Sequence, residues 1–206
     1  MENLFFSASA RILVLAPHPD DESIGCGGLL LKYSGQCDVV VLTDGRHGGL
    51  SGMDENETVT LRKLEFERAM VYAGVKKWFF LGVEDGKLSE SFAKFSELDF
   101  CGYDAIFVPA PGENHEDHAC VYEFFLKLKP QAQIFGYEVW SALGNPSHYI
   151  DITDVVEEKK RLIAFHESQT AQVDYVSKAI SLNCFRGMLV YPAVQYAEAY
   201  KGLGLI

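Results

Sequence analysis

Three carboxylates stand side by side at Asp20, Asp21 and Glu22, directly after a histidine and a proline. In a folded chain, adjacent carboxylates raise one another's pKa unless a cation sits among them. His18 adds a nitrogen donor two residues before the first carboxylate. Histidine nitrogen with carboxylate oxygen is the ligand set of a catalytic zinc site, which uses three protein ligands and leaves one position for water. The run at residues 16–22 therefore predicts a metal site that performs chemistry.

A pair of histidines about a hundred residues later forms a second candidate cluster. His115 and His118 lie three residues apart within residues 109–118. At the start of a helix this spacing places both rings on one face, so that they can point at a common target. Such a pair is weak support when taken alone, because histidines more often lie on a surface or in a core. Its weight comes from the first cluster and from a fold that would bring the two together.

Strand-like and helix-like segments alternate along the chain. Strands are predicted at residues 11–16, 37–43, 77–81, 105–109 and 133–140, and helices at residues 27–33, 58–73, 91–98, 117–128, 154–166 and 175–181. This order is typical of an α/β, Rossmann-like three-layer fold with a mostly parallel sheet. We expect residues 1–206 to form a single domain, since the length suits one core.

The expected sheet also explains how the two clusters would meet. Ligands of such sheets bind at the carboxyl ends of the strands, where the strand order reverses. In the commonest order this point lies between the first and fourth strands. His18 follows the first predicted strand, and His115 and His118 follow the fourth. The three histidines are therefore expected to face one crevice.

Glycines after the first cluster raise the alternative of a dinucleotide site. Gly25, Gly27 and Gly28 come after the acidic residues, with a spacing that differs from the Gly-x-Gly-x-x-Gly pattern of such sites. Three carboxylates would also repel a phosphate, whereas a metal ion would neutralise them. We interpret the glycines as positions of close packing between the first helix and the sheet.

Composition limits the classes of partner. The net charge is −11, which argues against nucleic acid or an anionic membrane surface as the main partner. No apolar run approaches the roughly 18 residues of a membrane span. Five scattered cysteines without a Cys-x-x-Cys pair predict a reducing, cytoplasmic environment. We expect a small-molecule substrate, and a homo-oligomer is compatible with the sequence.

Taken together, the motifs resemble the PIG-L/LmbE family of zinc-dependent N-acetylglucosamine deacetylases. The resemblance rests on Pro-His-Pro-Asp-Asp-Glu at residues 17–22, Gly-Cys-Gly-Gly at residues 25–28 and Asn-His-Glu-Asp-His at residues 114–118. Further similar segments lie at residues 61–69, 80–86, 166–169 and 196–200. The resemblance covers nearly the whole chain, and the first two motifs in combination are highly specific.

The resemblance implies a metal site and a base. By similarity, His18, Asp21 and His118 would bind Zn²⁺, and Asp20 would act as the general base. A bound zinc ion lowers the pKa of its water from 15.7 toward about 7, which makes hydroxide available at neutral pH. Fe²⁺ or Co²⁺ would also suit this ligand set, because a His/His/Asp site selects weakly among divalent ions.

The resemblance also implies three supporting roles. His115 would stabilise the oxyanion as a protonated imidazole, and Asp117 would orient His115 and keep its pKa raised. Arg62 would bind the substrate through a sugar hydroxyl or phosphate. An ion pair between Arg62 and Glu65 on a helix surface is an equally compatible interpretation.

The predicted function is that of a zinc-dependent hydrolase, which removes an acetyl group from an N-acetylated amino sugar or glycoconjugate. Two alternatives remain open from the residues alone, another metal-dependent hydrolase such as a phosphoesterase and a non-catalytic Rossmann-like binding module. The glycine-rich loop at residues 45–49, with Arg46 and His47, is expected to border the crevice. A substrate contact, a mobile lid and an ordinary exposed loop are all compatible with it.

Overall fold

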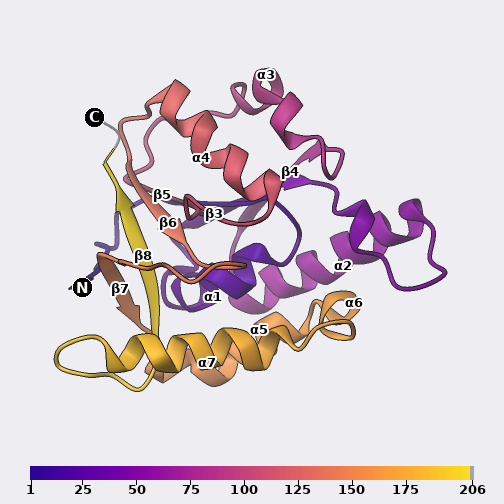
Figure 1. Cartoon of the computed structure of the whole chain (residues 1–206). Helices are drawn as coiled ribbons and strands as arrows, with labels where there is room; N and C mark the ends of the chain where they lie inside the picture. The colour runs from indigo at the N-terminus through magenta and orange to yellow at the C-terminus, as the bar shows by residue number, and fades with distance from the viewer. Residues whose placement is uncertain (205–206) are drawn as a thin grey trace.

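The computed structural model describes residues 1–204, which build one eight-stranded sheet between two layers of helices (Figure 1). The strands are β1 (Glu2–Asn3), β2 (Ile12–Ala16), β3 (Cys37–Thr43), β4 (Lys77–Val83), β5 (Ala105–Pro109), β6 (Gln133–Tyr137), β7 (His148–Asp151) and β8 (Ala197–Leu203). Their order is β1-β7-β8-β6-β5-β2-β3-β4. Only β8 among these strands runs antiparallel to its neighbours. The predicted α/β, Rossmann-like three-layer fold is confirmed.

The helices divide between the two faces of the sheet. One face carries α1 (Asp21–Tyr33), α2 (Glu55–Ala73), α5 (Val156–Ala164), α6 (Glu167–Thr170) and α7 (Tyr175–Met188), and the other carries α3 (Phe92–Phe95) and α4 (Glu116–Leu128) (Figure 1). The fold agrees with the alternation read from the sequence. No helix in residues 1–204 is long and apolar enough to cross a bilayer.

Strand β2 is buried on both sides and divides the core in two. Ile12 and Val14 belong to the apolar cluster that includes residues of α1 and α2. Leu13 and Leu15 belong to the cluster on the opposite face, which includes residues of α4. This arrangement explains why β2 is an uninterrupted apolar run rather than an alternating one.

Several predicted boundaries differ from the structure, and the start of α1 is the one that bears on the site. Helix α1 begins at Asp21, six residues before its predicted start, so Asp21 and Glu22 occupy its first turn. Acidic side chains suit that position, because the amino end of a helix carries partial positive charge. Strand β8 was not predicted, because its sequence includes the buried Glu198 and lacks a strand-like apolar pattern.

The strand order reverses between β2 and β5, as the sequence predicted. Strand β2 pairs in parallel with β3 on one side and with β5 on the other. The chain leaves β2 toward α1 and leaves β5 toward α4, so the carboxyl ends of these two strands carry the two histidine-containing motifs. The topology thereby brings together residues about a hundred positions apart.

Candidate metal centre and active site

Two histidines and an aspartate meet at the carboxyl ends of β2 and β5. His18 lies two residues after β2, Asp21 begins α1, and His118 lies in the first turn of α4. The carboxylate oxygen Oδ2 of Asp21 lies 3.2 Å from His18 Nδ1 and 3.1 Å from His118 Nε2. The two ring nitrogens are 3.4 Å apart. All three side chains are buried.

These separations fit a divalent ion. Nitrogen and oxygen ligands bind zinc at 2.0–2.2 Å in a tetrahedral arrangement, which places neighbouring ligand atoms roughly 3.3 Å apart. The three atoms of His18, Asp21 and His118 already stand at such distances from one another. The described residues therefore include a histidine–aspartate cluster that is suited to hold a metal ion.

The charges in this cluster favour the ionised form of Asp21. Burial raises the pKa of Asp21, but the neighbouring His118 and His18 outweigh it and hold that pKa well below the usual value. Burial lowers the pKa of His18, whereas hydrogen bonds to Asp117, Asp21 and Asp85 raise it overall. Asp21 is thus a carboxylate across the physiological range, as a metal ligand must be.

The second ring nitrogen of His18 is held by two further aspartates. His18 Nε2 lies 3.1 Å from Asp85 Oδ1 and 3.2 Å from Asp117 Oδ2. The Asp117 carboxylate also accepts hydrogen bonds from the backbone N–H groups of Gly86 and Leu88. A carboxylate on the outer nitrogen of a ligating histidine fixes the ring and its tautomer. His18 Nδ1 is therefore the nitrogen that is turned toward the candidate ion.

Sequence reasoning did not assign Asp85. It follows β4, the strand after β3, and its carboxylate reaches the site from the turn before α3. The signal was present, because an acidic residue after a parallel strand lies at the same edge of the sheet as His18. A second possible ligand group, formed by His18, Asp85 and Asp117, lies around the outer nitrogen of His18.

The expected contact between Asp117 and His115 is replaced by other contacts. The Asp117 carboxylate binds His18, and His115 Nδ1 is buried without a hydrogen-bond partner among the described residues. The ring of His115 instead stacks on Trp140, with centroids 6.4 Å apart. Burial and the nearby His18 and His118 lower the pKa of His115 and outweigh the opposing effect of Asp117, so this pKa lies below its usual value instead of above it.

Asp20 has different surroundings from its neighbour Asp21. Its backbone N–H donates to the Glu22 carboxylate at 3.1 Å, and its own carboxylate lies 3.3 Å from the Arg62 guanidinium. Burial raises the pKa of Asp20 to about 6, although Arg62 opposes the shift. A carboxyl group of this pKa can exchange a proton near neutral pH.

Arg62 holds two loops together beneath Asp20. Its guanidinium donates to the backbone oxygens of Gly45 and Pro19, at 2.9 and 3.1 Å, and the residue is only 3% exposed. A Cβ atom at Gly45, where φ is 65°, would come within 2.6 Å of this group. The alternative ion pair with Glu65 is absent from the described residues, because that carboxylate accepts hydrogen bonds from Ser168. Arg62 thus uses part of its donors within the protein, while its Nε is buried without a hydrogen-bond partner among the described residues.

A cavity of about 330 Å³ opens over this site. Its lining includes His18, Asp20, Asp21, His47, Gly48, Arg62, Asp85, Gly86, His115, Trp140, Gln169 and Tyr175. Trp140, which belongs to this lining, is half exposed. Within the loop at residues 45–49, His47 faces the cavity, while Arg46 forms ion pairs with the acidic side chains around it.

Comparison with known proteins agrees with the geometry. The family model described as PIG-L, GlcNAc-PI de-N-acetylase, matches residues 13–129. A diacetylchitobiose deacetylase of Thermococcus kodakarensis is 31% identical over 193 residues, which cover 80% of this chain and 72% of that protein.

Solved structures give the same result. The N,N'-diacetylchitobiose deacetylase of Pyrococcus horikoshii, in complex with an inhibitor, superposes with a TM-score of 0.80 and 25% identity over 95% of this chain and 84% of that chain. A conserved protein of Thermus thermophilus shares the fold, with a TM-score of 0.78 and 23% identity over 96% of both chains. The extent of these matches and the paired motifs lead to one conclusion: this chain belongs to the PIG-L family.

Proposed function

We propose that the protein is a metal-dependent N-deacetylase that hydrolyses the acetamido group of an amino sugar or glycoconjugate. The observation that carries this proposal is the buried cluster of His18, Asp21 and His118 beside a separate carboxylate, Asp20, whose pKa is raised to about 6. Membership of the PIG-L family and the deacetylases among its relatives support the same reaction.

The proposed ligands of the ion are His18 Nδ1, His118 Nε2 and the Asp21 carboxylate, with Zn²⁺ as the proposed metal. When bound, such an ion supplies a water of lowered pKa and polarises the substrate carbonyl. Fe²⁺ or Co²⁺ would fit the same donors. Asp85 and Asp117 position His18 in this proposal, which replaces the role of Asp117 as a partner of His115.

Asp20 is the proposed general base. It accepts a proton from the attacking water and then donates a proton to the departing amine. Its raised pKa suits both steps, because the protonated and the ionised forms of Asp20 are both accessible near neutral pH. Arg62 positions Asp20 and the loop beside it, and its placement in the cavity wall leaves room for a substrate contact as well.

His115 is the proposed donor to the oxygen on which negative charge develops. An N–H group that is fixed in place before the reaction stabilises such charge without reorganisation. The stacked ring of Trp140 holds His115 at the cavity wall. Trp140 and Tyr175 are also the aromatic groups on which a sugar ring can lie.

The wider proposals follow from the same features. We propose one deacetylase-like domain over residues 1–206, supported by the single continuous sheet; residues 205–206 lie outside the described part of the chain. We propose a cytoplasmic location, supported by five free cysteines. The relatives that act on diacetylchitobiose support a small amino-sugar conjugate as substrate.

Acetate release tests the proposed function. The protein is loaded with Zn²⁺ and incubated with N-acetylglucosamine, diacetylchitobiose and, as a contrast, p-nitrophenyl phosphate. We expect acetate from an acetylated sugar, at least about a hundredfold less in Asp20→Asn, and little change in the matched surface variant Asp154→Asn. Phosphate release without acetate release would instead support the phosphoesterase alternative.

A further inference from the structure

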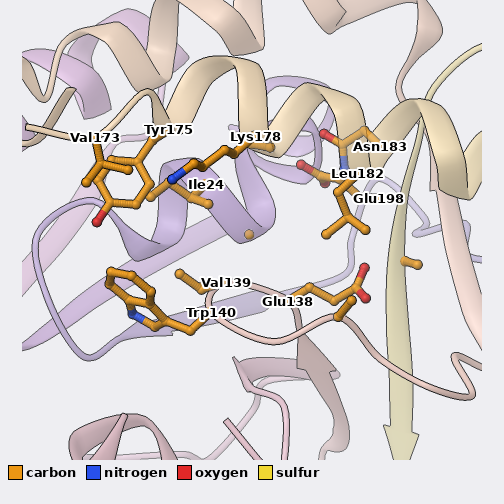
Figure 2. Close-up of a pocket in the computed structure, with 14 residues that line it drawn as sticks. Ile24, Glu138, Val139, Trp140, Val173, Tyr175, Lys178, Leu182, Asn183 and Glu198 are labelled. Carbon is orange, nitrogen blue, oxygen red and sulfur yellow. The ribbon is translucent and has the colours of Figure 1, made fainter. Parts of the chain in front are cut away.

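A second cavity, of about 340 Å³, lies beside the cavity over the candidate metal centre. Figure 2 shows the side chains that line this second cavity. Trp140 and Tyr175 line both spaces, and their ring centroids lie 5.9 Å apart in an edge-to-face arrangement. Helix α7 covers one side of the second cavity, and the segment that follows β6 covers the other (Figure 2). The two rings thus separate the proposed reaction site from a space that the reaction itself does not use.

The lining of this second cavity is largely apolar. Ile24 from α1 and Val139 from the segment after β6 contribute aliphatic surface, as do Ala179 and Leu182 of α7. Lys178 lies along the same helix with an exposed side chain. Its aliphatic stem adds to the lining while its ammonium group can stay in water.

The two carboxylates of the cavity already have cationic partners. Glu138 forms a buried, two-pronged ion pair with Arg186. Glu198 lies 2.7 Å from the buried ammonium group of Lys159. A carboxylate that is paired in this way does not require a cation from a ligand, and it does not repel an uncharged ligand. The cavity is therefore suited to an uncharged, apolar group.

We propose that this cavity is a subsite for an apolar chain that the substrate carries past Trp140 and Tyr175. The proposal rests on the proposed deacetylase function, because it extends the same substrate. At the roughly 30 Å³ that one water molecule occupies, the cavity holds about ten heavy atoms, so that a six-carbon chain fits entirely. The chain could be an alkyl group on the anomeric oxygen or an acyl group longer than acetyl on the nitrogen.

Three glycosides separate these sources. They are the methyl and hexyl β-glycosides of N-acetylglucosamine and the methyl β-glycoside of N-hexanoylglucosamine. We expect the zinc-loaded enzyme to hydrolyse at least one hexyl-bearing compound with a kcat/KM at least about tenfold above that of the methyl N-acetyl glycoside, because burying methylene groups is favourable. The preferred compound identifies the source of the chain.

Variants in the cavity test its location. Leu182→Asp places a charge on the lining, and Ala142→Trp fills the cavity from an exposed loop position. Both should bring the ratio of hexyl to methyl kcat/KM to about one. Ser181→Asp adds the same charge to an exposed position of α7 outside the lining and should retain the preference. No preference in the wild type, or a preference that survives in both cavity variants, would overturn the proposal.

A binding measurement separates this proposal from the proposed function. The chain has two tryptophans, so Trp78→Phe leaves Trp140 as the only one. The metal-free Trp78→Phe protein is titrated with the three glycosides, and Trp140 fluorescence reports binding without hydrolysis. We expect a hexyl compound to bind at least about tenfold more tightly than the methyl N-acetyl glycoside, and Leu182→Asp to abolish the difference. If the hexyl compound binds more tightly but no amide is hydrolysed, only the deacetylase function is contradicted. If an amide is hydrolysed but the hexyl and methyl compounds bind equally, only the subsite is contradicted.

Discussion

At the scale of single residues, three consecutive carboxylates have three different sets of partners. Asp20 lies beside Arg62, while Asp21 lies between two histidines. Glu22 lies 3.2 Å from His166. Burial alone would raise the pKa of both aspartates, but only Asp21 has partners strong enough to reverse the shift. The opposed shifts are typical of a site in which one carboxylate holds a metal and its neighbour moves a proton.

Two substitutions test this division of labour. Asp21→Ala should bind no metal, because it removes the proposed carboxylate ligand that lies between the two histidines. His115→Ala should keep the metal and lower turnover by roughly 10²–10³, the usual effect of losing one oxyanion donor. Metal content is measured by mass spectrometry and turnover by acetate release. Equal zinc content together with equal activity in the two variants would refute the assignment.

The role of Asp85 is tested through metal affinity. Asp85→Asn weakens a carboxylate contact to the outer nitrogen of His18, so we expect metal affinity to fall roughly 10–100-fold. Glu84→Gln changes an exposed neighbour and should leave the affinity unaltered. Competition with a chromophoric chelator gives both dissociation constants. Identical constants for the two variants would show that Asp85 does not position the ligand.

At the scale of elements, a buried histidine links α6 to α1. His166 precedes α6, and its Nε2 lies 3.0 Å from Ser23 Oγ and 3.2 Å from the Glu22 carboxylate in the first turn of α1. Burial lowers the pKa of His166, but the contact with Glu22 raises it above the ordinary value of 6.5. In its protonated form, His166 therefore joins two elements that frame the site.

This link predicts a pH-dependent stability. Because the folded-state pKa of His166 is raised, its contribution is fully present below the unfolded pKa near 6.5 and is lost as the pH rises through the folded pKa. Urea unfolding of metal-free protein should show that His166→Gln is less stable than the wild type at pH 6, with a difference that shrinks toward pH 9. A difference that stays constant over this range would contradict the linkage.

Some elements could be predicted from sequence and others could not, for physical reasons. Strands β3 and β5 begin and end at the predicted residues because they are short, buried, apolar runs. Strand β8 escaped prediction because Glu198 satisfies the backbone N–H groups of Gly28 and Leu29 inside the core. That role depends on tertiary contacts, which no local pattern records.

At the scale of the whole molecule, topology converts distant motifs into one site. The order of β2, β3 and β5 brings His18 and His118 together, and the sequence predicted this meeting. The contributions of Asp85 and Tyr175 were not predicted. They reach the site from a loop and a helix end, and their positions depend on the packing of the complete chain.

A metal bound between β2 and β5 should also stabilise the fold. A ligand that binds only the folded state adds about 2.7 kcal/mol at a free concentration of 100 times its dissociation constant. Urea unfolding with Zn²⁺ at that concentration and with chelator should differ by this amount in the wild type. His118→Ala should show a much smaller difference, and an equal one would place the stabilising ion elsewhere.

The central claim is that two imidazoles and one carboxylate bind one divalent ion at this crevice. Anomalous diffraction from a crystal of the zinc-loaded protein, recorded at the zinc absorption edge, tests it most directly. We predict a single strong peak within about 2.0–2.2 Å of His18 Nδ1, His118 Nε2 and an oxygen of Asp21. A peak located elsewhere, or no peak in a crystal grown from the zinc-loaded protein, would contradict the account.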